Sequence, residues 1–339
     1  MKRKSVISAE NISIGYPRTK SNTENSLYDN LSFELFPGEL VCLLGSNGAG
    51  KSTLLRSISN SQPVVYGDIF LDGKIVKSYT EKDLSKIIGL VLTDKTSVGG
   101  LTVRELVELG RYPYTGFWGK LSKDDQKIID QVINDVGITH KANSYIAELS
   151  DGERQKAMIA KVLAQECPII LLDEPTAFLD IKSNIEIMNL LRVLAHEKEK
   201  TILMSTHNID LALLLADRLW LLSPHIGLES GVTEDIVLSG KLDGFFKSEN
   251  IQFNKDTGSF IPRFKGRIKA SINTNSDLYY HWTKNFLERN DVSVTDSEEE
   301  VSFDVEIVSP SSIHVKTNTD YHHFSDYSQF ASWLRKKSN

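Results

Sequence analysis

The sequence lacks features that mark several large classes of protein. It has two cysteines in 339 residues, Cys42 and Cys167, and both stand in apolar surroundings without metal-ligand spacing. We therefore expect buried, reduced thiols, as in a reducing compartment. No apolar run approaches the roughly 20 residues of a membrane-spanning helix, and the basic N-terminus is not followed by an apolar stretch of signal-peptide length. Any membrane role is expected to be peripheral.

An excess of positive charge is also missing. The formal net charge is -6, whereas nucleic-acid-binding proteins usually carry a basic face or stripe. DNA or RNA partners are therefore not expected. The composition that is present, 40% hydrophobic and 25% charged, is that of an ordinary globular protein. The length suits one large domain and a smaller one.

Short apolar segments alternate with helical patterns in the first two thirds of the chain. Leu40–Leu44, Ile169–Leu172 and Thr201–Ser205 read as buried strands, and the first precedes a glycine-rich turn and a helix. This alternation predicts an α/β fold with a mainly parallel sheet covered on both faces. We expect this body to end near Leu222.

The rest of the chain predicts a second, smaller domain. Residues 227–264 are rich in glycine and charge, which suggests a strand-poor extension and a boundary near Gly266. We therefore expect a large domain over residues 1–265 and a small α+β domain over 266–339. Strands are expected at 267–273, 292–295, 303–308 and 313–316, and helices at 277–290 and 327–337.

A glycine-rich loop follows the first predicted strand and opens a helix. It satisfies the P-loop pattern G-x-x-x-x-G-K-[ST], in which backbone N–H groups surround phosphate oxygens. Lys51 is expected to reach the β- and γ-phosphates of a nucleotide, and the Ser52 hydroxyl to bind Mg²⁺. A glycine-rich turn that only caps a helix is the alternative. The expected binding residues are Gly45, Ser46, Asn47, Gly48, Ala49, Gly50, Lys51, Ser52 and Thr53.

A second phosphate-site feature is the pair of carboxylates that ends the strand Ile169–Leu172. Asp173 is expected to hold Mg²⁺ through water, and Glu174 to polarise the water that attacks the γ-phosphate. Read alone, the segment is equally a strand that leads into a polar turn. The P-loop makes the catalytic interpretation the stronger one.

Leu149-Ser150-Asp151-Gly152-Glu153 resembles the LSGGQ signature of the ABC ATPase family. The resemblance implies a P-loop NTPase core with a helical subdomain. It also implies that Ser150, Asp151 and Gly152 bind ATP held by a second subunit, so that two half-sites make one catalytic site. The alternative is that Ser150 or Asp151 is simply the N-cap of a helix.

Further matches to this family extend over roughly Val6 to Leu222. Asp180 lies in a segment that resembles the D-loop, which crosses to the partner subunit. His207 matches the switch histidine that contacts the γ-phosphate, and Tyr16 resembles the aromatic residue that stacks on adenine. A polar strand end and a locally packed turn tyrosine are the respective alternatives.

Two positions depart from the family pattern. Asp151 adds a carboxylate near an incoming phosphate, and Asp94 stands where the Q-loop glutamine is expected. Because a carboxylate near phosphate is repelled while one near a divalent cation is attracted, we expect Asp94 to contact the catalytic Mg²⁺. Alternatively, Asp94 turns toward Lys95, Lys86 or solvent.

The segments 101–114, 206–212 and 216–222 resemble the ATPase subunits of bacterial importers for ferric siderophores, haem and cobalamin. This implies ATP and Mg²⁺ as ligands, a homodimer, and a cytoplasmic location on the inner face of the cell membrane. It also implies transmembrane permease subunits as partners, docked on a helical subdomain at about 96–149, and indirectly a substrate-binding protein. Two alternatives are a soluble ABC ATPase of iron–sulfur assembly or another non-transport machine, and a nucleotide-gated regulatory module. Four C-terminal histidines lack ligand spacing, so no metal is expected at His281, His314, His322 and His323.

Overall fold

The computed structural model describes residues 3–16, 26–92, 100–116, 119–246, 250–255, 257–264, 266–295 and 301–337. The chain forms two compact units, Met1–Phe246 with Lys255–Ser259, and Lys247–Asn254 with Phe260–Asn339. Each unit contains its own hydrophobic core. No helix in the described ranges is long and apolar enough to cross a membrane.

A six-stranded sheet forms the centre of the first unit. Its strand order is β10-β9-β3-β8-β7-β6, and only β10 runs antiparallel to its neighbour. Every residue of β3, β7 and β8 is buried, as expected for parallel strands covered on both faces. The three predicted strands are confirmed. The strands are β3 (Leu40–Leu44), β6 (Ile88–Val91), β7 (Ile169–Leu172), β8 (Thr201–Ser205), β9 (Arg218–Ser223) and β10 (Gly227–Val232).

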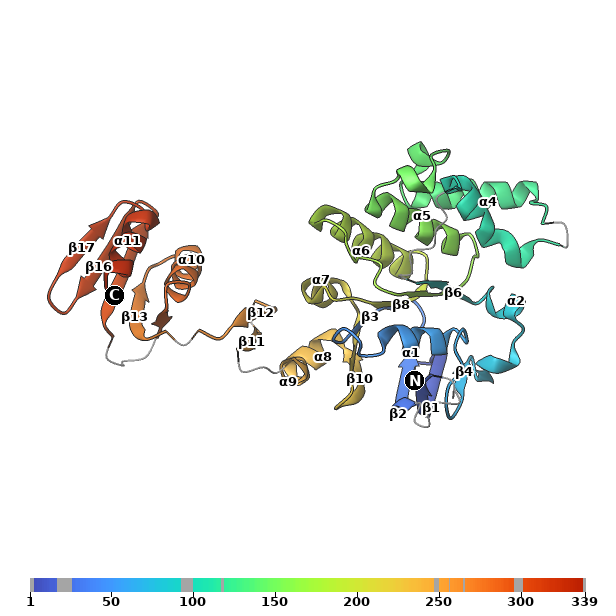
Figure 1. Ribbon diagram of the computed structural model, residues 1–339, viewed down its shortest axis with the longest axis horizontal. Coiled ribbons are helices and arrows are strands. Elements are labelled where there is room, and N and C mark those ends of the chain that lie inside the picture. Colours follow the sequence, from blue (N-terminus) through green and yellow to red (C-terminus); the bar gives the residue numbers. More distant parts are fainter. Residues whose placement is uncertain are drawn as a thin grey trace. The chain divides into compact units, whose positions relative to one another are not determined.

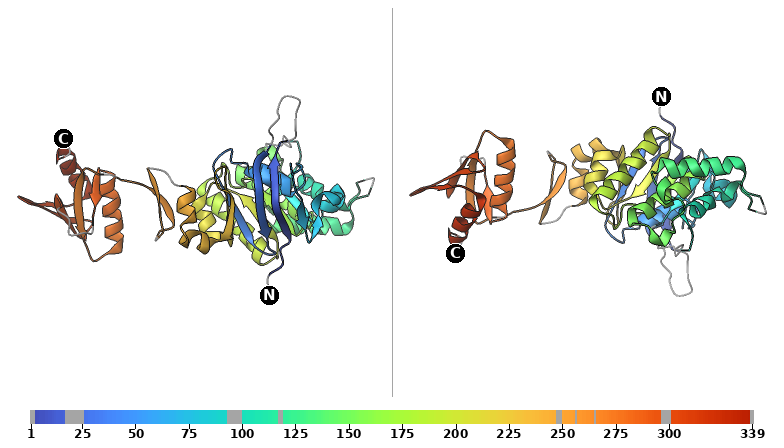
Figure 2. Two further views of the ribbon diagram at one scale, coloured as in Figure 1. Left: turned by 90° about the horizontal axis from the view of Figure 1, so that it is seen from below. Right: turned by 90° about the horizontal axis from the view of Figure 1, so that it is seen from above.

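A second, antiparallel sheet has the order β2-β1-β4-β5. Helix α1 (Lys51–Ile58) contributes Leu54, Leu55 and Ile58 to one core with apolar residues of both sheets. Helices α6 (Ile181–His196) and α7 (Ile209–Leu215) lie on the other side of the six-stranded sheet (Figure 1). The strands of the antiparallel sheet, which includes the blue pair β1 and β2 in Figure 2, are β1 (Ile7–Gly15), β2 (Ser26–Leu35), β4 (Ile69–Leu71) and β5 (Lys74–Ile75).

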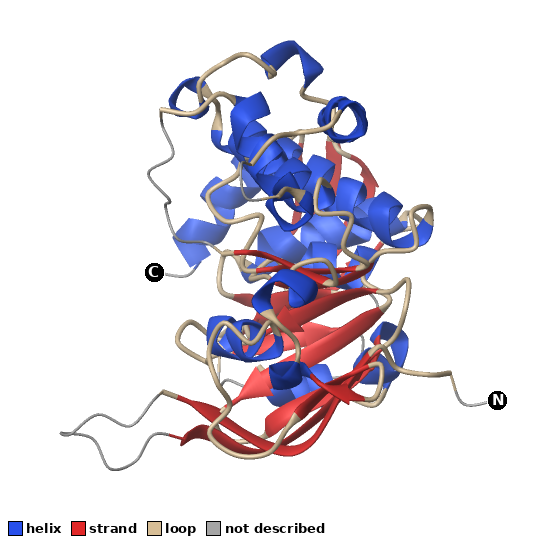
Figure 3. Ribbon diagram, turned by 90° about the vertical axis from the view of Figure 1, so that its right-hand side faces the viewer, coloured by secondary structure: helices blue, strands red, loops and turns tan. Residues whose placement is uncertain are grey.

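Helices and short 3-10 turns form a helical subdomain beside the sheets (Figure 3). Its longer helices start with polar capping residues, because the first N–H groups of a helix need acceptors. Thr102, Ser122 and Ser150 each make a capping box with the acidic residue three positions later. The elements are α3 (Val103–Glu108), α4 (Lys123–Asp135) and α5 (Asp151–Leu163), with 3-10 turns at Leu109–Tyr114, Thr139–Lys141 and Ile146–Glu148. Helix α2 (Glu81–Leu84) and the 3-10 turn Val76–Ser78 instead contribute Leu84 and Val76 to the core of the two sheets.

The prediction that the α/β body ends near Leu222 and continues as a strand-poor extension is wrong. Strand β10 adds to the sheet edge, and α8 (Thr233–Leu238) and α9 (Lys241–Phe245) follow it. Strands β11 (Ile251–Asn254) and β12 (Ser259–Pro262) then pair with each other. The sequence GLESGV of β10 has almost no apolar pattern, because this edge strand is held by backbone pairing to β9.

The second unit is a two-layer α+β structure with a five-stranded sheet of order β14-β13-β15-β16-β17. Alternate strand residues and both helices share one core, so α10 and α11 cover the same face of the sheet. Strand β17 was not predicted, because its central residues are two histidines. The elements are β13 (Ile268–Asn273), α10 (Asp277–Glu288), β14 (Val292–Val294), β15 (Phe303–Ser309), β16 (Ser312–Thr317), β17 (Tyr321–Phe324) and α11 (Tyr327–Lys337).

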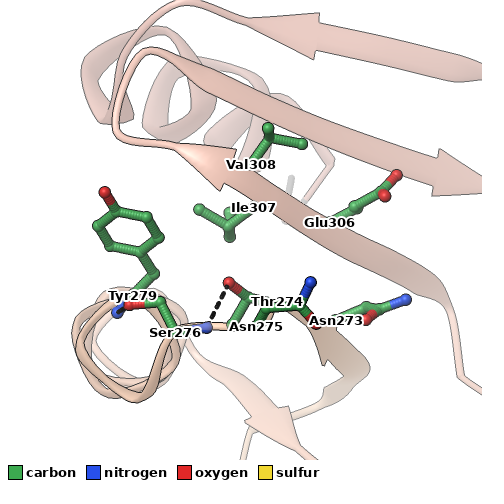
Figure 4. Close-up of a pocket in the computed structure, with 8 residues that line it drawn as sticks. All are labelled: Asn273, Thr274, Asn275, Ser276, Tyr279, Glu306, Ile307 and Val308. Carbon is green, nitrogen blue, oxygen red and sulfur yellow. Dashed lines mark hydrogen bonds between the residues drawn. The ribbon is translucent and has the colours of Figure 1, made fainter.

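An open cleft of about 240 Å³ lies in this second unit, where β13 leads into α10 beside the end of β15 (Figure 4). One N–H of the first turn of α10 is satisfied from within the chain, since the Ser276 hydroxyl accepts a hydrogen bond from Tyr279 N. The cleft is lined by Asn273, Thr274, Asn275, Ser276, Tyr279, Glu306, Ile307 and Val308.

Candidate active site

Three neighbouring parallel strands of the first unit end at the same edge of the sheet. In the order β3, β8, β7, each strand is followed by residues that the sequence marks as candidates. The glycine-rich loop follows β3, His207 follows β8, and Asp173 and Glu174 follow β7. The carboxyl ends of parallel strands are where α/β proteins usually bind ligands. Residues more than 120 positions apart in sequence are therefore brought together.

The loop after β3 is held close to its surroundings. A Cβ on Gly45 would stand 2.6 Å from the backbone oxygen of Leu222, and Gly48 and Gly50 have φ of +77° and +86°, which favour glycine. Gly50 is the N-cap of α1 and makes no side-chain cap hydrogen bond. The first N–H groups of α1 therefore have no side-chain acceptor from their own cap, as an anion site at a helix N-terminus requires.

Tyr28 supports this loop, and the sequence reasoning missed it. Its side chain is 5% exposed, and its hydroxyl donates a 2.6 Å hydrogen bond to the backbone oxygen of Ala49. Burial raises the pKa of the Tyr28 hydroxyl, so it stays protonated and remains a donor. The only sequence signal is a tyrosine at an inward position of the alternating strand β2.

Lys51 lies at the centre of the site and is 5% exposed. Its Nζ donates hydrogen bonds to the backbone oxygens of Gly45 at 2.9 Å and Ser46 at 3.2 Å. The same nitrogen lies 3.6 Å from Glu174 Oε1. Burial lowers the pKa of Lys51, while the Glu174 carboxylate acts in the opposite direction. A buried ammonium group is stable here because it is paired and hydrogen-bonded.

His207 completes the group of charged side chains. Its Nε2 lies 2.5 Å from Glu174 Oε1 and 3.3 Å from Lys51 Nζ. Because a carboxylate only accepts and an ammonium only donates, Nε2 carries a proton that it donates to Glu174. The contact with Lys51 is then a close approach without a hydrogen bond. The structure thus brings Lys51, Glu174 and His207 together around one carboxylate oxygen.

Ser205, the last residue of β8, is a second residue that sequence reasoning missed. Its hydroxyl lies 2.7 Å from Asp173 Oδ1 and 2.9 Å from Glu174 N. The side chain is completely buried. A serine that ends an apolar strand two residues before a candidate histidine is a weak signal, and its partners lie about 30 residues away in sequence.

Oxygen donors suited to Mg²⁺ are present near Lys51. Asp173 is 5% exposed at the end of β7, and Ser52 lies in the first turn of α1. No group of three or more histidine, cysteine, aspartate or glutamate side chains in the described ranges is arranged as a metal site. Mg²⁺ is usually held by one or two protein oxygens together with phosphate and water. Asp94 lies outside the described residues.

The remaining candidates cap two other helices. Ser150 is the N-cap of α5, where its hydroxyl accepts from Glu153 N, and Asp151 pairs with Arg154 at 3.0 Å. The alternative N-cap interpretation therefore describes Ser150 in this structure. Asp180 caps α6 and accepts from Ser183 N at 2.8 Å. Gly152 lies against Ser183, so α5 and α6 begin side by side.

Tyr16 directly follows β1 and is 59% exposed. Its ring therefore has open space on at least one side, as a stacking residue needs. Within the described residues, no hydrogen bond or ion pair joins Tyr16, Ser150 or Asp180 to Lys51, Glu174 or His207. The structure thus forms one central group and leaves these candidates around it.

The fold and the central group define a P-loop ATPase. The family model described as ABC transporter matches residues 28–177. The chain is 37% identical to an ABC transporter ATP-binding protein of Methanocaldococcus jannaschii, over 75% of this chain and 86% of the relative. It is 35% identical to the ferric enterobactin transport ATP-binding protein of Escherichia coli, over 70% and 85%. The petrobactin import ATP-binding protein of Bacillus anthracis is 36% identical, over 74% and 92%.

Solved structures agree with these relatives. A metal-chelate type ABC transporter in an inward-facing conformation matches 77% of this chain and 99% of its own at a TM-score of 0.63 and 28% identity. A dimeric ATP-binding cassette with ADP and phosphate matches 67% and 98% at a TM-score of 0.58 and 28% identity. The chain belongs to the ATP-binding subunits of ABC transporters. It binds ATP and hydrolyses it.

Proposed function

We propose that this chain is the ATPase subunit of an ABC importer for a ferric siderophore, haem or cobalamin. Two copies close head to tail on two Mg-ATP molecules and drive a separate permease. The observation that carries the proposal is the convergence of Lys51, Glu174 and His207 at the ends of β3, β7 and β8. At a phosphate loop, an ammonium group can neutralise phosphate charge, a carboxylate can orient the attacking water, and an imidazole can contact the γ-phosphate.

In this proposal, bound ATP replaces the present partners of Lys51 and His207. The γ-phosphate replaces the Glu174 carboxylate as the anion beside Lys51, and the His207 Nε2–H turns from Glu174 to a phosphate oxygen. Glu174 Oε1, now 2.5 Å from His207, is then released to accept a proton from the attacking water. Tyr16 stacks on adenine, and the loop Gly45–Thr53 surrounds the phosphates.

Ser52 and Asp173 are proposed to hold Mg²⁺, and Asp94 to contact it from the Q-loop position. When bound, the ion neutralises charge on the β- and γ-phosphates. Asp94→Asn should then raise the Mg²⁺ concentration needed for half-maximal ATPase activity more than it changes metal-free nucleotide affinity. An unchanged Mg²⁺ titration contradicts this contact.

The second half of each catalytic site is proposed to come from a second copy. Ser150, Asp151 and Gly152 would face its ATP at the start of α5, and Asp180 would cross at the start of α6. Phe178 is 86% exposed beside Asp180 and has φ of +63°, which supports an apolar contact for a partner surface there. To donate to a phosphate oxygen, the Ser150 hydroxyl must turn its proton away from the Glu153 carboxylate, to which it now donates at 3.0 Å.

The permease is proposed to dock on the helical subdomain. The 3-10 turn Leu109–Tyr114 presents Leu109 and Tyr112, which are 51% and 77% exposed. Relatives named for ferric enterobactin and petrobactin support a ferric siderophore as the transported molecule. Uptake of radiolabelled ferric chelates by cells with and without this chain tests the substrate. If no polytopic protein copurifies with the chain, a soluble ATPase of another machine replaces the importer.

Residues 266–339 are proposed to form a separate domain that regulates the ATPase or stabilises its dimer. The support is the core shared by α10, α11 and the five-stranded sheet. Truncation near Gly266 should leave a soluble fragment that binds ATP. An insoluble fragment would show that the boundary is misplaced.

Glu174→Gln tests the catalytic proposal most directly. The phosphate contacts survive, while the group that accepts the proton of water is lost. We expect ATP hydrolysis to fall by about 10²- to 10⁴-fold. ATP binding should persist, and a stable dimer should accumulate in size-exclusion chromatography with ATP. Hydrolysis at the parental rate would show that Glu174 does not activate the water.

A further inference from the structure

Ser205 is the last residue of β8. It lies beside Asp173 and Glu174, which follow the neighbouring strand β7. Its hydroxyl lies 2.7 Å from Asp173 Oδ1 and 2.9 Å from Glu174 N, and no part of the side chain is exposed. One side chain therefore contacts both the proposed metal-side carboxylate and the backbone of the proposed water-activating residue.

The chemistry of the three groups fixes the position of each proton. A backbone N–H only donates, and an ionised carboxylate only accepts. The single hydroxyl proton of Ser205 therefore goes to Asp173, while a Ser205 lone pair accepts the Glu174 N–H. Because both partners are fixed, the hydroxyl has one orientation and holds the Asp173 carboxylate in register with the Glu174 backbone.

The backbone of Glu174 depends on such support. Its φ is +48°, in the left-handed region that non-glycine residues seldom adopt. The Ala177 N–H donates to the Glu174 carbonyl at 3.0 Å, so the residue is held through its carbonyl as well as through its N–H. This conformation sets the direction in which the Glu174 side chain leaves the main chain, and hence its contact with His207.

We propose that Ser205 is a positioning residue for ATP hydrolysis, which aligns Asp173 and Glu174 through one bridging hydroxyl. The inference rests on the proposed roles of these two residues. An apolar side chain at position 205 would fill the strand but leave a buried carboxylate oxygen and a buried N–H without this partner. Small displacements of catalytic groups reduce rate much more than they reduce substrate binding.

The Ser205→Ala variant tests this role. We expect kcat to fall by about 10- to 100-fold. The affinity for a fluorescent ATP analogue in EDTA should stay within about twofold, because the P-loop is untouched. The affinity of the nucleotide complex for Mn²⁺, measured by electron paramagnetic resonance, should fall about threefold or more as the Asp173 carboxylate loses its orientation. Ser205→Thr keeps the hydroxyl and should recover most of kcat and of the Mn²⁺ affinity.

Ser57→Ala is the matched control. Ser57 is 3% exposed, and its hydroxyl has no hydrogen-bond partner among the described residues. Parental kcat and Mn²⁺ affinity in Ser205→Ala would overturn the inference, as would equal losses in Ser57→Ala. The inference would also be overturned if Ser205→Thr kept the parental Tm but lost as much kcat and Mn²⁺ affinity as Ser205→Ala. Glu174→Gln, measured in parallel, distinguishes a failure of the proposed function from a failure of this inference. If Glu174→Gln retains ATP hydrolysis, the proposed role of Glu174 is wrong, whatever Ser205→Ala shows.

Discussion

Helices α1 and α10 each follow a parallel strand, and their first turns are built in opposite ways. Helix α1 follows β3 and begins at Gly50, which has φ of +86° and offers no side-chain acceptor. Helix α10 follows β13 and begins at Ser276, whose hydroxyl accepts from Tyr279 N. The first arrangement leaves N–H groups for a ligand, while the second satisfies one of them, that of Tyr279, internally.

The difference shows how one local geometry serves either function or stability. With glycine in place of a side-chain N-cap, α1 gives up only about 0.3 kcal/mol. In exchange its N–H groups and Lys51 surround a position suited to phosphate. At the cleft beside α10 in Figure 4, the cap residue Ser276 already accepts the Tyr279 N–H. Helix α4 is also satisfied internally, through Ser122 and Asp125.

The largest expected effect comes from disturbing the open helix start. In Gly45→Ala the new methyl group would lie 2.6 Å from the backbone oxygen of Leu222, so the loop must shift. We expect kcat/KM for ATP to fall by about 100-fold. Gly48→Ala is the matched control, because Gly48 also lies in the loop but has no atom within 4 Å of the new methyl group.

Gly48→Ala should reduce kcat/KM by less than Gly45→Ala does. Its only strain is the left-handed φ of +77°, which costs a side chain on the order of 1–2 kcal/mol. ATPase kinetics and titration with a fluorescent ATP analogue measure both variants. Equal losses would show that backbone conformation, and not the close approach to Leu222, governs the loop.

An intermediate effect is expected from the internally satisfied start of α4. Asp125 accepts hydrogen bonds from Ser122 N at 2.8 Å, Ser122 Oγ at 2.6 Å and Arg111 Nε at 2.7 Å. Asp125→Asn should lower the free energy of unfolding at pH 7 by about 2 kcal/mol, because hydrogen bonds to a charged group are lost. ATP affinity should stay unchanged. Urea denaturation measures the first quantity and nucleotide titration the second.

The loss of unfolding free energy in Asp125→Asn should also depend on pH. The hydrogen bonds from Ser122 and the Arg111 guanidinium hold the pKa of Asp125 below its ordinary value. Its stabilisation is therefore complete above the unfolded pKa of about 3.9 and is lost as pH falls through the lower folded pKa. The difference in unfolding free energy between parent and Asp125→Asn should shrink below about pH 4. A constant difference down to pH 2.5 would contradict the pKa direction.

The smallest effect is expected at the closed start of α10. Ser276→Ala should lower the free energy of unfolding of the second unit by about 1 kcal/mol. ATPase activity should remain within about twofold, because no P-loop contact is changed. Ser276→Asp keeps an acceptor at the cap and should retain stability. Calorimetry measures both variants, and a loss of ATP binding in Ser276→Ala would show that this helix start is more than a cap.

Contiguous patterns allowed much of the site to be predicted. The loop that ends in Lys51, the strand that ends in Asp173 and Glu174, and His207 after β8 each lie within one short segment. Buried parallel strands reveal themselves through unbroken apolar runs, so β3, β7 and β8 were predicted with their observed bounds. The sequence by itself therefore determined the class of fold and the candidate reacting groups.

Only the tertiary structure decided what supports those groups. Tyr28 and Ala49 are 21 positions apart, and Ser205 and Asp173 are 32 positions apart. Neither hydrogen bond can therefore be recognised from a short segment of the sequence. Strands β10 and β17 were missed for a related reason, since pairing with β9 and β16 stabilises them through backbone hydrogen bonds and not through an apolar alternation of their own. Hydrophobic periodicity records burial along a segment, whereas cross-chain hydrogen bonds depend on which segments the fold brings together.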